Sequence, residues 1–269
     1  MIPKIIHYVW VGNAPKSDLI LKCIASWKKY CPDYEIKEWG NDVLSEIDNQ
    51  YVKEAFEAKK WAFVSDYLRL YALKKYGGFY FDTDLEITAP LDKFREHAFV
   101  SGFENWYGLY SPITALMGAE KGNPIVKDLL AEYDNLHFLT NGVMDQTTNT
   151  KRISKYFEKE FNLLPPYDGK QTAHLNETSI IYPSFYFCTP EYDKENYSIH
   201  HFNASWVDET EKYYSRKQYV RVGRFRVIRF KKKLGAKSNK ISLKKNEKKL
   251  LSFSISERKK IYLIWCAEK

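Results

Sequence analysis

The sequence has few cysteines and no long apolar run, and both absences narrow the classes of protein to consider. Its four cysteines, at positions 23, 31, 188 and 266, form no CxxC pair and no dense framework, so a disulfide scaffold or a cysteine-held metal is not expected. No segment approaches the roughly 18 apolar residues of a membrane-spanning helix. The N-terminal "MIPKIIHYVWVG" lacks a small-residue cleavage site and resembles a first strand more than a signal peptide. We therefore expect a cytoplasmic protein.

The chain also lacks internal repeats, Pro-rich or Gly/Ser linkers and the common signatures of hydrolases. "GAKS" at 235–238 does not have the Gly-Lys-Ser order of a phosphate loop, which argues against ATP hydrolysis. We find no convincing Ser-His-Asp or Cys-His motif. The 269 residues, 44% of them hydrophobic and 16% aromatic, suffice for one sizeable core with an appendage.

The positive charge of the chain is concentrated in one segment. The net charge is +8, but residues 216–250 hold fifteen Lys or Arg and only one acid, Glu247. The remaining residues are therefore acidic, with 33 Asp or Glu against 27 Lys or Arg. This break predicts two domains, a body at 1–215 and a basic C-terminal extension at 216–269.

Strand and helix patterns alternate along the body. "PKIIHYVWVG" and "YEIKEWG" predict strands on either side of a helix at "DLILKCIASWKKY", and one long helix is expected from about Asn41 to Tyr76. "HAFVSGF", "PITALMGAE" and "TSIIYPSFYF" predict later strands. This alternation indicates an α/β fold.

Two carboxylates stand in the middle of "GGFYFDTDLEI", residues 77–87. In an extended segment Asp82 and Asp84 lie on the same side, where they can converge on a divalent cation or a polyhydroxyl ligand. The helix just before them is apolar almost all round, except for a polar strip of Ser65, Asp66 and Arg69. That strip is either an internal i,i+3 ion pair or the wall of a polar cavity.

Three segments carry a resemblance to a known family. "IIHYVWVG", "SDYLRLYALKKYGGFYFDTDLEI" and "HHFNASW" resemble the DXD-containing sugar transferases, which include fungal α-1,6-mannosyltransferases, bacterial polysaccharide enzymes and, more distantly, the glycosyltransferase domain of large clostridial toxins. The resemblance covers roughly residues 1–207. It implies a GT-A type fold, a Rossmann-like mixed sheet flanked by helices, together with a nucleotide-sugar donor, Mn²⁺ or Mg²⁺, and transfer with retention.

The resemblance also implies roles for residues of the donor site. Ser65 is expected near the ribose, and Tyr80 and Asp82 near the nucleoside and sugar. Asp66 and Arg69 would hold donor hydroxyls and phosphate. Trp10 is expected to stack on the nucleotide base, which suits an aromatic face.

A second set of roles concerns the metal and the leaving group. The resemblance implies that Asp84 is a direct metal ligand and that "IHHFNASW" supplies a second ligand, His201, with the register between His200 and His201 left open. Ser205 and Trp206 are expected to close over the diphosphate, with the Trp206 indole donating to the leaving oxygen. Asp145 is a further carboxylate without an assigned place.

The expected activity is metal-dependent, retaining transfer of a hexose from a UDP- or GDP-linked donor to a glycan or lipid-linked oligosaccharide acceptor, as in bacterial surface polysaccharide synthesis. A toxin-like transferase acting on a protein would share the same site residues. A nucleic-acid-binding protein would use the basic extension but would not need the DxD body, so nucleic acid is an unlikely partner.

The basic segment 216–250 suits the inner face of an anionic membrane, where a lipid-linked acceptor is found. Each Lys or Arg near such a surface contributes on the order of 1 kcal/mol. "RVGRFRVIRFKKKLGAKS" mixes apolar residues with arginines, as an interfacial helix or a basic edge strand would. We therefore expect reversible, peripheral attachment to the membrane.

Overall fold

The computed structural model describes residues 1–106, 108–113 and 115–203, and the backbone of four strands between residues 218 and 266. The chain divides into two compact units, Met1–Asn203 and Ala204–Lys269. The boundary that the sequence predicts at residue 215 falls within 204–217, outside the described residues.

The first unit alternates helices and strands as the sequence predicts. Its helices are α1 (Asp18–Tyr30), η1 (Asn41–Glu46), α2 (Gln50–Glu57), α3 (Trp61–Tyr76), η2 (Asp92–Glu96), α4 (Pro124–Ala131), α5 (Asn149–Phe161) and α6 (Ser184–Phe187), where η marks a 3-10 helix. Its strands are β1 (Ile5–Val9), β2 (Glu35–Trp39), β3 (Gly78–Phe81), β4 (Leu85–Ile87), β5 (Phe99–Gly102), β6 (Glu104–Trp106), β7 (Leu109–Ser111), β8 (Leu116–Ala119), β9 (Leu139–Thr140), β10 (Val143–Met144), β11 (Ala173–His174), β12 (Ser179–Tyr182) and β13 (Ser198–His200).

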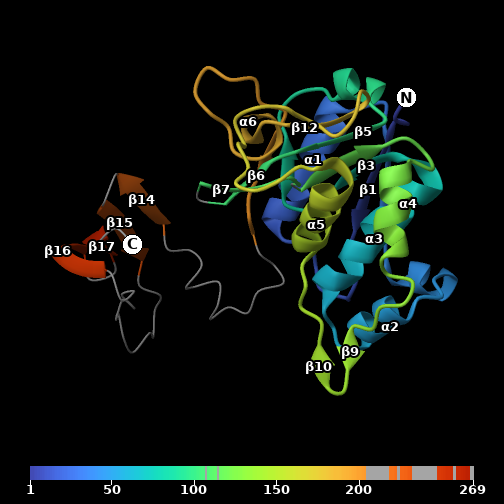
Figure 1. Ribbon diagram of the computed structural model, residues 1–269, viewed down its shortest axis with the longest axis horizontal. Helices are drawn as coiled ribbons and strands as arrows, with labels where there is room; N and C mark the ends of the chain where they lie inside the picture. Colours follow the sequence, from blue (N-terminus) through green and yellow to red (C-terminus); the bar gives the residue numbers. More distant parts are fainter. Residues whose placement is uncertain are drawn as a thin grey trace. The chain divides into compact units, whose positions relative to one another are not determined.

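Seven of these strands form one mixed sheet in the order β11-β12-β5-β8-β3-β1-β2. β1 pairs in parallel with both β2 and β3, and β12 pairs in parallel with β5, whereas β8 runs antiparallel between β3 and β5 (Figure 1). This arrangement confirms the predicted α/β class and the mixed sheet.

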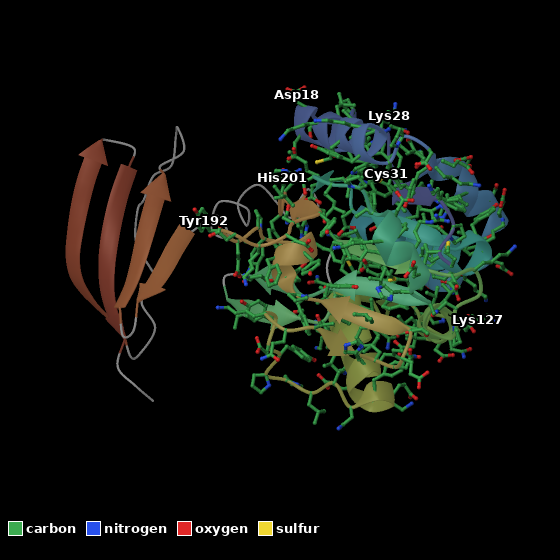
Figure 2. The ribbon with its side chains drawn as sticks, turned by 90° about the horizontal axis from the view of Figure 1, so that it is seen from above. Asp18, Lys28, Cys31, Lys127, Tyr192 and His201 are labelled. Carbon is green, nitrogen blue, oxygen red and sulfur yellow. The ribbon has the colours of Figure 1, made fainter. Side chains whose placement is uncertain are left out.

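Helices cover both faces of the sheet. One core contains Tyr80 and Met117 together with apolar residues of α2 to α5, and the other contains Phe79 and Phe81 with Trp27 of α1 and Phe187 of α6. Successive strand residues point to opposite faces, which is why neighbours such as Phe79 and Tyr80 belong to different cores. Figure 2 accordingly shows Asp18 and Lys28 of α1 on one side of the sheet and Lys127 of α4 on the other.

The long helix expected from about Asn41 to Tyr76 is wrong, because this segment forms η1, α2 and α3 in succession. Asn49 begins α2, since its side-chain oxygen accepts a hydrogen bond from the backbone N–H of Val52 at 3.1 Å. Lys59 then adopts a positive φ of 57° and ends the run before α3. α3 is buried over most of its length, as the sequence predicts, and Gly77 ends it.

Two glycines allow the chain to turn from α3 directly into β3. Gly77 and Gly78 have φ angles of 69° and 100°, which L side chains rarely adopt. A Cβ on Gly77 would lie 2.5 Å from the backbone nitrogen of Lys121, and one on Gly78 would lie 2.6 Å from the Ile5 carbonyl oxygen. Only glycine therefore permits the tight approach that places β3 beside β1.

The second unit contains a four-stranded antiparallel sheet, with order β14-β15-β17-β16. The strands are β14 (Gln218–Val222), β15 (Phe225–Lys231), β16 (Glu247–Ser256) and β17 (Lys259–Cys266). The interfacial helix considered for this segment is therefore wrong over residues 218–222 and 225–231. β14 is an edge strand, as the other interpretation requires, but β15 is paired on both sides.

Candidate active site

The candidate site forms where β3 ends and a tight turn leads into β4. The turn contains both aspartates, and it is closed by a hydrogen bond from the Leu85 N–H to the Asp82 carbonyl at 3.0 Å. β13 then pairs antiparallel with β4, placing His200 opposite Leu85. The pairing brings a late segment of the chain beside the turn, so side chains from distant parts of the sequence meet there.

Asp82 is held by residues that lie just before it in the sequence. Its Oδ1 accepts a hydrogen bond from the Tyr80 hydroxyl at 3.1 Å and forms an ion pair with Nη2 of Arg69 at 3.2 Å. The guanidinium of Arg69 also lies over the Tyr80 ring, 4.5 Å from its centroid. Asp82 and Arg69 therefore belong to one hydrogen-bonded group.

Asp66 extends this group into the core. Its Oδ1 lies 3.0 Å from Nη2 of Arg69, and its Oδ2 accepts from the Asn149 N–H at the start of α5. Burial raises the pKa of Asp66 to about 6, against the opposing effect of Arg69. The i,i+3 ion pair considered from the sequence is thus present. Because Arg69 also reaches Asp82, the same pair forms one wall of the site.

Asp84 is held instead by residues from the end of the first unit. Its Oδ2 accepts a hydrogen bond from the backbone N–H of Asn203 at 2.6 Å, and its Oδ1 lies 3.6 Å from Nε2 of His200. Burial opposes ionisation of Asp84, but His200 and the Asn203 N–H outweigh it and hold the pKa of the carboxyl below its usual range. Burial likewise disfavours the charged form of His200, yet the adjacent Asp84 carboxylate raises the histidine's pKa well above its usual value.

The structure distinguishes the two neighbouring histidines. The ring of His201, labelled in Figure 2, makes its hydrogen bond to Glu86, with 2.8 Å between Nε2 and Oε2. Lys22 of α1 contacts the same Glu86 oxygen at 2.8 Å. His201 reaches Asp84 through its backbone, because its N–H donates to the Asp84 carbonyl at 3.1 Å. Of the two registers left open by the sequence, the geometry places the ring of His200 beside the carboxylate of Asp84.

Glu104 is a carboxylate of this site that the sequence analysis missed. It begins β6, and its Oε2 lies 3.7 Å from Nδ1 of His200, a buried atom that has no hydrogen-bond partner among the described residues. Burial, reinforced by Asp82 and Asp84, raises the pKa of Glu104, while His200 opposes the shift. Its sequence signal was available: like Asp82, it follows closely on a fully buried strand, β5.

The remaining predicted residues lie around this centre or outside the described part. Ser65 donates to the Ala62 carbonyl, and its own carbonyl accepts from Arg69. Trp10 donates its indole N–H to the Ala14 carbonyl, and none of the hydrogen bonds or ring contacts found for the described residues joins it to the aspartates. Asp145 pairs with Arg152. Ser205 and Trp206 fall within 204–217, outside the described residues.

The donor set suits a divalent cation that binds together with a phosphate ligand. Among the described residues there is no group of three or more His, Cys, Asp or Glu that could hold a metal ion. Mg²⁺ is usually bound by one or two carboxylates plus phosphate oxygens rather than by a complete protein cage. The ionised Asp84, with Asp82 one residue away and His200 beside it, fits such an incomplete set.

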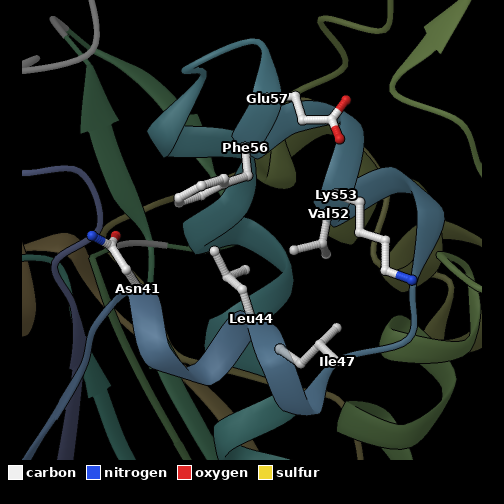
Figure 3. Close-up of a pocket in the computed structure, with 7 residues that line it drawn as sticks. All are labelled: Asn41, Leu44, Ile47, Val52, Lys53, Phe56 and Glu57. Carbon is white, nitrogen blue, oxygen red and sulfur yellow. The ribbon is translucent and has the colours of Figure 1, made fainter.

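Two cavities of similar size lie in different surroundings. One, of about 380 Å³, is lined by Leu44 and Ile47 of η1 and Val52 and Phe56 of α2 (Figure 3), and none of the acids described above borders it. The other, of about 370 Å³, borders His200 and includes Trp106. We call it the Trp106 cavity; its lining is Asn105, Trp106, Gly108, Cys188, Thr189, Pro190, Ile199, His200 and Phe202. Of these two cavities, the Trp106 cavity is the one bordered by His200, the residue beside Asp84.

Comparison with known proteins shows which proteins the region around this site resembles. Residues 17–100, which include both aspartates, match the family described as a glycosyltransferase sugar-binding region containing the DXD motif. This part of the chain is therefore similar to DXD glycosyltransferases, in agreement with the resemblance drawn from the sequence. The mixed sheet flanked by helices agrees with the predicted GT-A type fold.

Individual relatives can also be named. Over 164 residues the chain is 29% identical to inositol phosphoceramide mannosyltransferase 3 of Schizosaccharomyces pombe, a match covering 54% of this chain and 42% of the relative. The match thus spans less than half the length of that protein. Two solved structures are more distantly similar: PaToxG glycosyltransferase (TM-score 0.45, 20% identity, 60% of this chain and 70% of that chain) and the ligand-free glycosyltransferase domain of the YGT toxin (TM-score 0.32, 11% identity, 63% and 70%).

Proposed function

We propose that the protein is a metal-dependent, retaining glycosyltransferase that moves a hexose from a UDP- or GDP-linked sugar to a glycan acceptor. One observation carries the proposal: within the DXD region, Arg69 joins Asp66 to Asp82 while Asp84 is held separately by His200 and Asn203. Such a site offers the positively charged guanidinium of Arg69 and several carboxylates to a ligand that has phosphates and hydroxyls.

The residues around Arg69 bind and orient the donor in this proposal. Asp66 and Tyr80 fix the guanidinium from two sides, so its remaining N–H groups are held in place for a phosphate or a sugar hydroxyl. Asp82 accepts from donor hydroxyls through its second oxygen. Because these groups are fixed before the donor binds, they stabilise developing charge without reorganising.

The reaction replaces one bond at the anomeric carbon. The bond from that carbon to the diphosphate oxygen breaks, the acceptor hydroxyl oxygen bonds to the same carbon, and the hydroxyl proton passes to the departing diphosphate. Arg69 opposes the negative charge that the diphosphate gains. A divalent cation held by Asp84, with His200 beside it, would neutralise further charge on the phosphates.

A screen of nucleotide sugars tests the proposal. Hydrolysis of UDP- and GDP-linked hexoses is measured with and without Mn²⁺, beginning with a mannose donor because the fungal relative is named a mannosyltransferase. We expect turnover of at least one donor, dependent on the cation, and the same donor should raise the melting temperature. Absence of turnover and of thermal stabilisation for every donor would refute the proposal.

The second unit supports a proposal about location. None of the described residues forms a helix long and apolar enough to cross a membrane. The strands β14 and β15 lie within the basic segment 216–250, and register places Arg221 directly opposite Arg226. A concentration of Lys and Arg of this kind favours an anionic partner. We propose that this segment holds the enzyme at an anionic membrane surface, where it meets a lipid-linked acceptor.

Liposome co-sedimentation tests this location. Full-length protein should sediment with anionic vesicles and not with neutral ones, and the binding should weaken as salt is raised. A variant in which Arg221 and Arg226 are both changed to Gln should bind less to the anionic vesicles. Equal binding by this variant would show that β14 and β15 do not contact the membrane. Competition by a DNA duplex would favour a nucleic-acid partner instead.

A further inference from the structure

The Trp106 cavity adjoins the reaction centre and has no role in the function proposed so far. His200 belongs to both places, because it lines the cavity and its Nε2 lies 3.6 Å from Asp84. The volume, about 370 Å³, is near the lower end of the roughly 300–1,000 Å³ typical of small-ligand sites. A ligand of the size of one or two sugar rings can therefore be accommodated next to His200.

A continuous aromatic surface runs from the β6–β7 hairpin to His200. The rings of Trp106 and Phe202 meet edge to face with centroids 5.1 Å apart, and those of Phe202 and His200 are 4.0 Å apart. Trp106 is 37% exposed, so part of its indole is accessible to solvent. An exposed indole presents an apolar face on which the C–H side of a pyranose ring can stack.

Polar groups accompany these rings. Asn105, on β6, and Thr189, just after α6, both line the cavity. Backbone and thiol contacts fix both residues, since the Asn105 N–H and the Thr189 hydroxyl each donate to the Cys188 sulfur, at 3.4 and 3.6 Å. An apolar surface with a few fixed polar groups is the composition of a carbohydrate site rather than of an apolar-ligand site.

The strand β6 connects this cavity to the carboxylates. Glu104 and Trp106 are two residues apart, so they lie on the same side of the strand at a spacing of about 7 Å. Glu104 lies against His200 at the reaction centre, while Trp106 lines the cavity. One monosaccharide ring stacked on Trp106 can thus reach Glu104 with a hydroxyl.

We propose that the Trp106 cavity binds a monosaccharide unit of the acceptor, stacked on Trp106 and Phe202, with its attacking hydroxyl directed to Glu104. This inference rests on the proposed function and names the acceptor as a hexoside. The donor is bound by Arg69 and its partners Asp66, Tyr80 and Asp82, none of which lines the Trp106 cavity. Acceptor binding and donor hydrolysis are therefore separable by mutation.

Two measurements test the cavity. Binding of methyl hexosides at millimolar concentration, in the gluco, galacto and manno series, is followed by saturation-transfer NMR, and donor hydrolysis without acceptor is followed in parallel. We expect Trp106→Ala to weaken binding of the preferred hexoside about tenfold or more, and Trp106→Phe to restore most of it. Thr189→Tyr should also block binding, because it fills the cavity. All three variants should keep the donor hydrolysis of the wild type.

Matched controls distinguish the possible failures. Leu139→Ala, an exposed apolar residue on the β9–β10 hairpin, should leave hexoside binding unchanged. The inference is overturned if the wild type binds no hexoside, if Trp106→Ala binds as well as the wild type, or if the variant instead raises the donor KM. If the wild type hydrolyses no donor, the proposed function is refuted separately, because hexoside binding is measured without a donor.

Discussion

The two aspartates of the motif lie one residue apart, yet different parts of the chain hold them. Asp82 contacts Tyr80 and Arg69, which precede it closely, whereas Asp84 contacts Asn203, 119 residues later, and its neighbour His200. The first group is complete once α3 and β3 are packed. The second exists only after β13 pairs with β4. One half of the site is therefore local in sequence and the other is assembled over a long distance.

The largest effect is expected on the long-distance half. Asp84→Ala should lower metal-dependent donor turnover by about 10³-fold, because it removes the carboxylate proposed to hold the cation at the diphosphate. The melting temperature should fall as well, because His200 is then buried without its partner, so turnover is compared at a temperature at which both proteins are folded. Asp33→Ala, which removes an exposed carboxylate paired with Lys4, is the control and should retain activity. Turnover of the Asp84 variant within about threefold of wild type would exclude the metal role.

Substitutions of Arg69 and Asp66, in the local half of the site, should lower the free energy of unfolding as well as activity. Arg69→Ala leaves Asp66 buried without its partner, at a cost of about 3–5 kcal/mol in the free energy of unfolding. Asp66→Asn in the Arg69→Ala background should then add little. Urea unfolding of the two single variants and the double variant measures this coupling. Additive losses would mean that the two residues act independently.

The buried residue His7, which contacts Gly77 between α3 and β3, makes the free energy of unfolding depend on pH. His7 accepts from the Trp39 indole through Nδ1 and contacts the Gly77 carbonyl through Nε2 at 2.8 Å, and burial lowers its pKa to about 4. Above pH 6.5 His7 is neutral in both folded and unfolded chains. As the pH falls from 6.5 to 4 the unfolded chain takes up the proton first, so His7 by itself should lower stability by about 3 kcal/mol. Asp66, whose pKa burial raises to about 6, takes up its proton first in the folded chain and opposes this loss, so the contribution of His7 is the difference between the wild type and a variant that lacks it.

Urea unfolding between pH 7.5 and pH 4 measures this loss. In His7→Gln most of the loss attributed to His7 should disappear, whereas His174→Gln, on an exposed strand residue, should lose stability as the wild type does. A wild-type profile identical to that of His7→Gln would show that protonation of His7 does not control stability.

The smallest expected effect separates the two histidines. His200→Ala should raise the Mn²⁺ concentration for half-maximal turnover about 10- to 100-fold, because its ring lies beside Asp84. His201→Ala should change it about twofold or less, since that ring contacts Glu86. The reverse order of effects would favour His201 as the metal ligand.

The same division between local and distant contacts explains what the sequence could reveal. The alternation of apolar segments predicted the α/β fold, and helical spacing grouped Asp66 with Arg69 because both lie on one face of one helix. The break of the helix at Lys59 was missed, because a positive φ at a lysine has no signal in composition. Pairing of β13 with β4 was not predictable either. Consequently the sequence left His200 and His201 undecided and overlooked Glu104.

The pairing of β13 with β4 also affects how the site forms during synthesis of the chain. During synthesis the N-terminal part of a chain emerges and folds first. A nascent chain that has reached residue 190 already contains β3, β4 and both aspartates, but neither His200 nor Asn203. Asp84 then has no hydrogen-bond donor from β13 or the residues after it, and the proposed cation site is incomplete. Ribosome-bound or prematurely terminated chains of this length would therefore carry the motif without its activity.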